Sequence, residues 1–145
     1  MKLYEKMNLY LANQEISFIK LHNLHWYIQG NAFFILHAKF EELYDQTATV
    51  IDEVAERLLM LGQNPVANVK KALEIATIKE LSDQPINKDN AIRQLTEDVK
   101  YWVNDTAEIV TLAEESGDSV TADLFNGYLK EYQKLLWMLN AYSAS

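Results

Sequence analysis

Glycine and proline, the residues that most often interrupt regular structure, are scarce in this sequence. The 145 residues include only four glycines and two prolines, and apolar residues recur mostly at three- and four-residue steps. This spacing predicts helices, because side chains three and four positions apart lie on one face of an α-helix. The sequence therefore favours an all-α protein, and its 49% hydrophobic content is enough for one domain over residues 1–145.

The glycines and prolines divide the chain into four long predicted helices and one short one. We expect the long helices over about 3–29, 32–61, 88–116 and 119–141, and a short amphipathic helix near 69–81. Gly62 and Gly117 stand where helices commonly end, while Asn87 and either Asp118 or Ser119 are N-cap candidates. Four long helices with a short one in the central crossover predict a four-helix bundle.

Charge and composition exclude several kinds of partner and chemistry. A formal charge of -8 opposes binding to nucleic acid or to an anionic membrane and favours cations. Without cysteine the chain has no disulfide, thiolate metal site or thiol nucleophile. The longest early apolar run, residues 32–36, is far too short for a signal segment or membrane span. We therefore expect a cytoplasmic protein with no membrane partner.

Five residues in the first half of the chain have side chains typical of metal ligands: His25, His37, Glu41, Asp52 and Glu56. On the second predicted helix His37 and Asp52 are about 22 Å apart, whereas ligand atoms lie about 2 Å from a metal. One chain therefore cannot bring both to the same ion. If two copies of this helix cross antiparallel between positions 46 and 47, His37 faces Glu56 and Glu41 faces Asp52. The spacing predicts a symmetric dimer with two equivalent metal sites.

The ligand-type residues of the second helix share one face, next to the apolar stripe that forms the core. Ala38, Ala48 and Ala55 lie among them, and alanine allows another helix to approach closely. The alternative is a solvent-exposed polar face, since isolated acidic residues are mostly exposed. Four ligand-type residues arranged about one dyad favour the metal site.

The choice of metal follows from the donors. A hairpin centred near Asn31 places His25, on the first helix, beside His37. Imidazole with carboxylate suits iron(II), zinc, manganese or cobalt, and carboxylates also help to hold iron(III), so redox iron is the interpretation that uses all five residues. An ordinary di-iron centre inside one bundle would use Glu-x-x-His pairs, and the sequence contains none. We expect His22, the remaining histidine, to be structural.

Similarity to a known family extends along nearly the whole chain. It is carried by residues 25–27, 31–34, 36–37, 40–44, 51–57, 61–62, 117–118, 121–124 and 136–139, which read HWY, NAFF, LH, FEELY, IDEVAER, LG, GD, TADL and LWML. Together these stretches resemble the Dps family of mini-ferritins. The resemblance implies a ferritin-like bundle that assembles from dimers into a hollow dodecamer, a shell of about twelve subunits. It also implies that iron(II) is oxidised at the dimer interfaces, preferably by hydrogen peroxide, and stored inside as ferric mineral.

The resemblance assigns the ligands to two subunits. His25, His37 and position 41 come from one subunit, and Asp52 and Glu56 come from its dimer partner, to bind two irons in each site. Position 41 is most often Asp in the family. The side chain of Glu41 is longer, and this difference affects the occupancy of the weaker of the two iron positions. The short crossover helix is implied to lie at the dimer contact.

Three further residues receive roles by the same resemblance. Trp26 matches a tryptophan that takes up oxidising equivalents near the site, and an aromatic residue of the interface is the alternative. Glu114 and Asp123 match acids that line an iron-entry pore on a threefold axis. Ordinary acidic residues near helix ends are the alternative for these two.

Two other functions stay open beside iron storage. Some members of the family compact DNA through a mobile, lysine-rich tail, but here helix signals begin at about Leu3 and residues 140–145 carry no basic group. We therefore expect iron storage without DNA binding. A DNA-binding protein that compacts the nucleoid and a non-catalytic helical assembly remain the alternatives.

Overall fold

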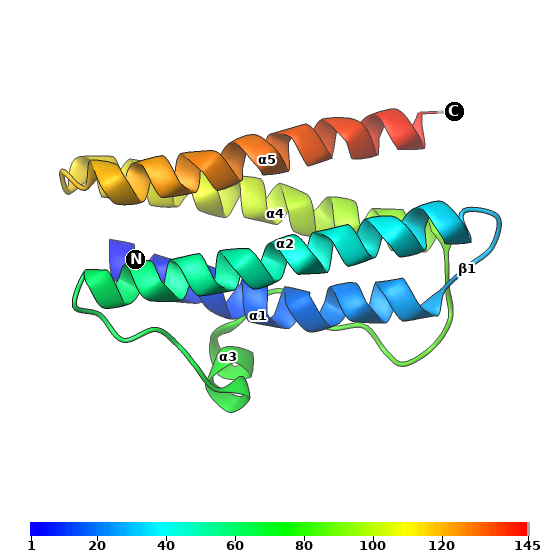
Figure 1. The fold of residues 1–145 in the computed structure, drawn as a ribbon, viewed down its shortest axis with the longest axis horizontal. Coiled ribbons are helices and arrows are strands. Elements are labelled where there is room, and N and C mark those ends of the chain that lie inside the picture. The colour runs from blue at the N-terminus through cyan, green and yellow to red at the C-terminus, as the bar shows by residue number, and fades with distance from the viewer. Residues whose placement is uncertain (145) are drawn as a thin grey trace. The chain divides into compact units, whose positions relative to one another are not determined.

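The structure is a computed structural model that describes residues 1–144, and nearly all of its regular structure is helical (Figure 1). Its elements in chain order are α1 (Leu3–Tyr27), β1 (Ile28–Gln29), α2 (Phe33–Met60), α3 (Val69–Ile75), β2 (Ile86–Asn87), α4 (Lys88–Glu115) and α5 (Ser119–Ser143). The four predicted long helices and the short crossover helix are therefore present. Across residues 1–144, no helix is both long and apolar enough to span a bilayer.

The described chain divides into two compact units. One unit comprises residues 8–91, with most of α1, all of α2 and α3, and both strands. The other comprises residues 1–7 and 92–144, with most of α4 and all of α5. The single domain expected over residues 1–145 stays a prediction.

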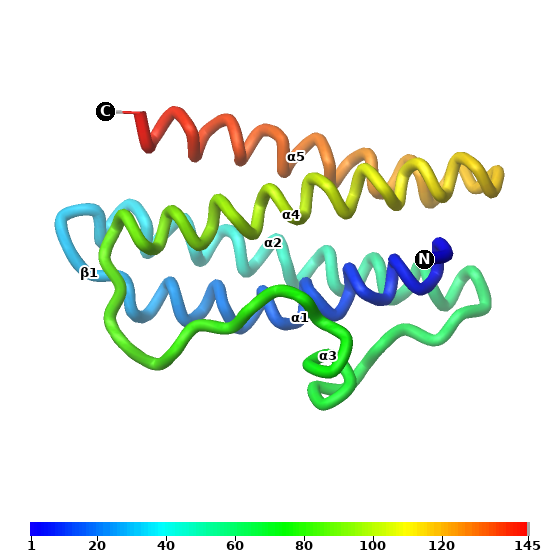
Figure 2. Tube along the Cα trace, turned by 180° about the vertical axis from the view of Figure 1, so that it is seen from behind, coloured from blue at the N-terminus to red at the C-terminus, as the bar shows by residue number. Residues whose placement is uncertain are grey.

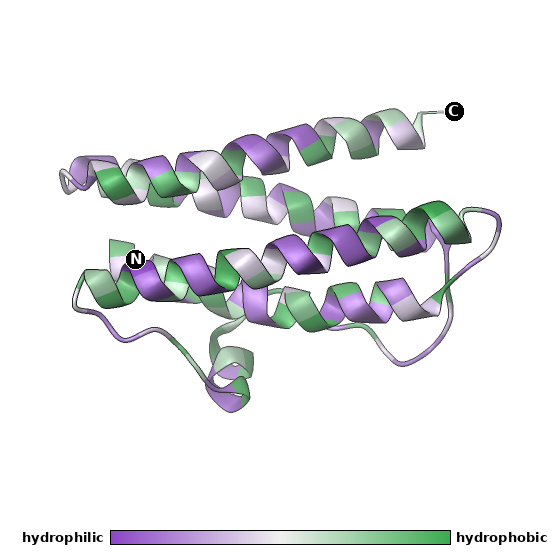
Figure 3. Cartoon of the chain, viewed as in Figure 1, coloured by the Kyte–Doolittle hydropathy of each residue, from purple (hydrophilic) through white to green (hydrophobic). Residues whose placement is uncertain are grey.

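In the unit of residues 8–91, α1 and α2 lie side by side and antiparallel (Figures 1 and 2). Apolar and polar residues alternate along the helices in Figure 3, as expected for amphipathic helices. Large apolar side chains that are fully buried in this unit include Tyr10, Leu11, Leu24, Phe40, Val54 and Leu58. The hairpin turns through Gly30, whose φ of 116° lies in the region that favours glycine.

The first helix ends two residues before the predicted boundary. Ile28 and Gln29 leave the helix and pair in parallel with Ile86 and Asn87, which lie far along the chain. This pairing supplies hydrogen bonds to backbone groups of Ile28 and Gln29 that a longer helix would otherwise have supplied.

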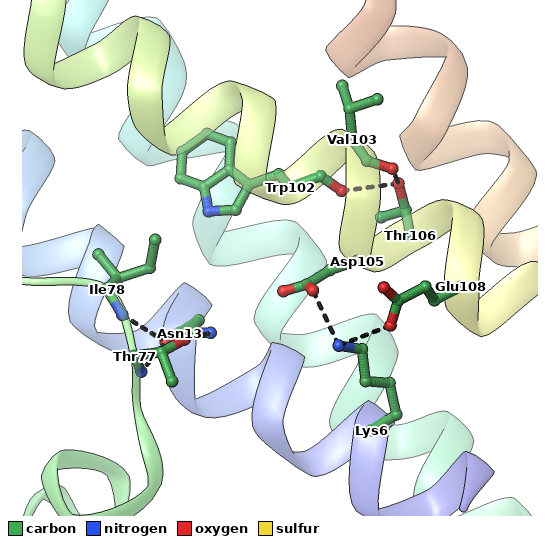
Figure 4. Close-up of polar contacts among 9 residues, drawn as sticks. All are labelled: Lys6, Asn13, Thr77, Ile78, Trp102, Val103, Asp105, Thr106 and Glu108. Carbon is green, nitrogen blue, oxygen red and sulfur yellow. Dashed lines mark hydrogen bonds and ion pairs between the residues drawn. The ribbon is translucent and has the colours of Figure 1, made fainter. Parts of the chain in front are cut away.

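The crossover helix ends at Ile75, so the prediction of helix up to about residue 81 is wrong. The buried side chain of Asn13 on α1 accepts hydrogen bonds from the backbone N–H groups of Thr77 (2.7 Å) and Ile78 (3.0 Å), as Figure 4 shows. Its amide also donates to Thr77 Oγ1 at 3.0 Å. These bonds hold an extended segment against α1. The N–H groups of Thr77 and Ile78 thus bond to a side chain and not to the carbonyl groups of a longer helix.

In the other unit, α4 and α5 form a second antiparallel hairpin (Figure 2). Gly117 ends α4 with a φ of 75°, and the Asp118 N–H donates to the Ala113 carbonyl at 2.8 Å, the pattern of a glycine C-cap. Asp118 then caps α5, since its side chain accepts from the Thr121 N–H at 3.0 Å. Of the two predicted cap candidates, the structure selects Asp118.

A charged cluster lies inside this second unit. Lys6 Nζ is 3.0 Å from Asp105 Oδ1 and 2.9 Å from Glu108 Oε2 (Figure 4). Burial lowers the pKa of Lys6, but the hydrogen bonds to Glu108 and Asp105 outweigh it, so the pKa lies above 10.5. Burial is also the largest influence on Asp105 and raises its pKa, which Lys6 only partly offsets. Asp105 is 4% exposed and therefore depends on Lys6 for its compensating charge.

Replacing Lys6 with Met should lower the free energy of unfolding by about 3 kcal/mol, because a buried carboxylate loses its cation. Urea denaturation at pH 7 measures the loss. The matched control is Lys2→Met at an exposed lysine, with an expected change below about 0.5 kcal/mol.

Stabilisation by Lys6 is complete below about pH 10.5 and is lost as the pH rises through the higher folded pKa. The difference between wild type and Lys6→Met should therefore shrink at strongly alkaline pH, and equal stability of the two at pH 7 would contradict the assignment.

Candidate metal centre

The end of α1 and the start of α2 bring His25 and His37 into direct contact. The two imidazole rings stack with centroids 3.7 Å apart and an angle of 14° between their planes. Each ring also bonds to the other residue's backbone, with His25 Nδ1 2.6 Å from the His37 carbonyl and His37 Nδ1 2.7 Å from the His25 carbonyl. The hairpin geometry predicted from the spacing about Asn31 is thus present.

These reciprocal bonds decide which nitrogen of each imidazole is free. A carbonyl oxygen can only accept, so Nδ1 carries the proton in both rings when the imidazoles are neutral. Each Nε2 is then left with a lone pair, the form in which histidine binds a metal. The backbone of the hairpin therefore prepares two nitrogen donors side by side.

Glu41 adds an oxygen donor one turn further along α2. Its Oε1 lies 3.8 Å from His25 Nε2, and its side chain is 55% exposed, against 8% for His25. The three side chains His25, His37 and Glu41 thus come from two adjacent helices. Within residues 1–144, however, no group of three or more such side chains in one chain is close enough to hold a metal ion.

The other two predicted ligands lie far from this cluster in the same chain. α2 is one unbroken helix from Phe33 to Met60, so Asp52 is about 22 Å from His37 along its axis. Asp52 and Glu56 are both exposed. The structure does not bring them to the histidines within one subunit.

Tyr44, an aromatic residue that the sequence did not single out as a site residue, lies beside the cluster. Tyr44 stacks on His22 with centroids 3.8 Å apart and meets His25 edge-on at 5.3 Å. Burial raises the pKa of Tyr44, as do the charges of Glu41 and Asp45 and a hydrogen bond to Glu41. Helical spacing could have drawn attention to Tyr44, which follows Glu41 by three positions and His37 by seven.

The remaining predicted residues lie elsewhere. Trp26 is 67% exposed, and its ring centroid is 5.3 Å from that of His22. Glu114, near the end of α4, and Asp123, in the second turn of α5, are exposed. A site on a threefold axis needs further subunits, so the pore stays a prediction.

Comparisons with known proteins agree with this fold. The model of the ferritin-like domain family matches residues 4–144. The DNA protection during starvation protein 2 of Bacillus anthracis is 39% identical over 141 residues, which are 97% of this chain and 96% of that protein. The ferritin-like class predicted from the sequence is confirmed.

Solved structures agree equally well. Dps from Staphylococcus aureus has a TM-score of 0.94 at 34% identity and covers 99% of this chain and 95% of its own. The DPS protein from Vibrio cholerae O1, described as a member of a broad superfamily of ferritin-like diiron-carboxylate proteins, has a TM-score of 0.92 at 38% identity, over 97% of this chain and 87% of its own. Sequence and fold agree along nearly the whole length, and this chain belongs to the Dps family of ferritin-like proteins.

Proposed function

We propose that this protein oxidises iron(II) at sites shared between two subunits and stores the product inside a shell of its own copies. The observation that carries the proposal is the layout of α2. A prepared pair of imidazoles lies at one end of an unbroken helix, and two exposed carboxylates lie at the other end. Only a second, antiparallel copy can bring these two halves together.

Each site would use five side chains from two chains. His25, His37 and Glu41 of one subunit would face Asp52 and Glu56 of the partner subunit, and the dyad would create a second, equivalent site. Two imidazoles and three carboxylates suit iron(II) as the substrate and also hold iron(III) after oxidation. This donor set has room for two irons per site, and the description of the Vibrio cholerae relative as a diiron-carboxylate protein supports that number.

Two iron(II) ions in one site are the reason why we propose hydrogen peroxide, a two-electron oxidant, as the preferred oxidant. Each iron(II) gives up one electron, the O–O bond of one peroxide breaks, and two protons complete two water molecules. Both electrons are then delivered together, so no hydroxyl radical is released. The name of the Bacillus anthracis relative, which refers to DNA protection, is consistent with removal of iron and peroxide before they damage DNA.

Storage requires an enclosed volume, so we propose a closed shell of about twelve copies built from these dimers. In this shell the short helix α3 would lie at the dimer contact. Glu114 and Asp123 would line an entry pore for iron(II), and Trp26 would take up oxidising equivalents that escape the site. We further propose that residues 1–145 act as one domain in the cytoplasm. We also propose that the protein does not bind DNA, because the net charge of each chain is -8.

Peroxide should oxidise protein-bound iron much faster than air does. Anaerobic protein loaded with two iron(II) per chain receives either hydrogen peroxide or dissolved oxygen, and absorbance of iron(III) is followed by stopped flow. We expect the peroxide rate to exceed the oxygen rate by at least about tenfold, because the two-electron step matches two irons. Spin trapping in the same samples should find little hydroxyl radical. A radical yield equal to that of free iron(II) would remove the protective function even if iron binds.

A further inference from the structure

We propose that a second copy of this chain covers the groove between α1 and α3, and that this contact tightens when the Glu15 side chain takes up a proton. The contact rests on the proposed function, since it uses the twofold axis of the proposed iron site. It adds a pH-dependent element of assembly that lies away from the five ligands. The partner is the chain itself, and the ligand is one proton at each of two equivalent carboxyl groups.

The groove lies between the middle of α1 and the start of α3 and has a volume of about 260 Å³. Figure 2 shows α3 beside α1. Ile16 and Ile19 line the groove from α1, and the apolar residues of α3 that line it are Val69, Ala72 and Leu73. In the single chain Ile19, Val69 and Leu73 are 48% to 74% exposed. Large exposed apolar side chains grouped around a groove are typical of a surface that another protein covers.

The position of the groove along the helices matches the proposed twofold axis. His25 stacks on His37, and the Phe18 ring meets the Tyr44 ring edge-on at 6.2 Å. These two contacts set the register of the antiparallel helices α1 and α2, which have the same rise per residue. Glu15 therefore lies at about the level at which the proposed axis crosses α2. Two copies related by this axis would bring their grooves to the same level.

One face of α1 joins the groove to the metal centre. Steps of three and four residues along α1 place four side chains on this face, those of Glu15, Ile19, His22 and Trp26. The His22 ring stacks on Tyr44, and its centroid is 5.3 Å from that of Trp26. A second copy that brings its carboxylates to the histidines at one end of this face would extend over the groove at the other end. This continuity favours a second copy over an unrelated partner.

The Glu15 carboxyl group makes the contact sensitive to pH. Its side chain is half-buried in the apolar groove and has no hydrogen-bond or ion-pair partner within residues 1–144. Burial raises the pKa of Glu15 to about 7. Among the described residues that line the groove, Glu80, from the segment after α3, is the other titratable one, and it is exposed. No lysine, arginine or histidine of this lining offsets the charge of Glu15.

The direction of the pH effect follows from burial. A second copy would exclude water from Glu15 and raise its pKa further, because the charged form is the more costly one to bury. Each dimer would then bind up to two more protons than two separate chains as the pH rises above about 7. The contact is therefore strongest below about pH 7 and weakens as the pH rises through the higher pKa of the dimer.

Dissociation of assembled shells tests this pH dependence. Shells are placed in a fixed concentration of urea at pH 6 or pH 8, and light scattering follows their dissociation. The ratio of the rate at pH 8 to the rate at pH 6 should be at least about tenfold larger in wild type than in Glu15→Gln, which cannot ionise. A pKa shift of one unit at each of two carboxyls changes the dimer equilibrium by up to about a hundredfold, and most such changes appear in the dissociation rate. Glu131→Gln, at an exposed glutamate of α5, is the matched control and should keep the wild-type ratio.

A single introduced thiol tests whether the second copy covers the groove. The chain contains no cysteine, so Leu73→Cys provides one thiol at the rim of the groove. At pH 7 this thiol should react with a maleimide at least about tenfold more slowly in the shell than in the same variant dissociated by urea, because reaction requires access. This measurement is independent of Glu15→Gln and decides the contact even if that variant fails to assemble.

The possible outcomes separate this contact from the iron site. Equal pH ratios in wild type and in an assembled Glu15→Gln shell would overturn the proton-linked contact. A Leu73→Cys thiol that reacts at full rate in the shell would mean that the groove is open to solvent or to another partner, which also overturns it. Shells that show the expected pH dependence but bind no iron(II) in an anaerobic titration would overturn the proposed function and leave the contact in place. A protein that stays monomeric at both pH values would overturn both.

Discussion

Shells assembled from equal amounts of two complementary half-site variants should recover about a quarter of the wild-type iron sites, although neither variant has activity alone. One variant carries His25→Ala and His37→Ala, and the other carries Asp52→Ala and Glu56→Ala. Each alone should lose fast iron oxidation completely, because every site lacks two of its five ligands. These single-variant losses do not by themselves show that a site is shared.

The mixture distinguishes a shared site from a one-chain site. With random pairing about half of the dimers are hybrids, and one of the two sites in each hybrid regains intact histidines and intact carboxylates. The opposite site of that hybrid loses all four. Stopped-flow oxidation and anaerobic iron(II) titration of co-expressed, assembled shells measure the recovery. Mixing the two purified, preassembled variants is the control, since subunits that do not exchange should restore nothing. Hybrid shells without any recovery would mean that the ligands act within one chain.

The second large effect is the state of assembly. Native mass spectrometry at neutral pH should give a particle of about 200 kDa, twelve times the 16.7 kDa of the chain. A shared metal site needs dimers, and a mineral store needs an enclosed volume, so the isolated subunit is not expected to be the stable form. Aerobic loading should then add iron well beyond two ions per chain without loss of solubility. Detection of monomers or isolated dimers only, with iron limited to the binding sites, would contradict storage.

Much of the fold follows from local features of the chain. Gly62 and Gly117 end helices because both adopt a φ of 75° that other residues avoid. Asn87 and Asp118 begin the next helices because their side chains accept the orphan N–H groups of the first turn, those of Asn90 and Thr121. Such signals act over a few residues, so helix number, order and approximate length could be predicted from the sequence.

The pairing of His25 with His37 was also predictable, because a short hairpin leaves the two helices few ways to align. Spacing along α2 likewise determined that Asp52 and Glu56 cannot reach the same ion as His37 within one chain. In both cases helical geometry converts sequence separation into distance, and no knowledge of tertiary contacts is needed.

What only the tertiary structure decided involves contacts between residues far apart in the sequence. The end of α3 at Ile75 depends on Asn13 capturing backbone groups of the crossover, and the end of α1 at Tyr27 depends on pairing with Ile86 and Asn87. Neither pairing leaves a local signal. In the same way, the sequence by itself determined the helices and the five ligand-type residues, whereas the free Nε2 atoms and the stacking of Tyr44 on His22 appear only after α1 and α2 pack. The physical reason is that hydrogen-bond partners are chosen by position in space, which periodicity along one helix does not encode.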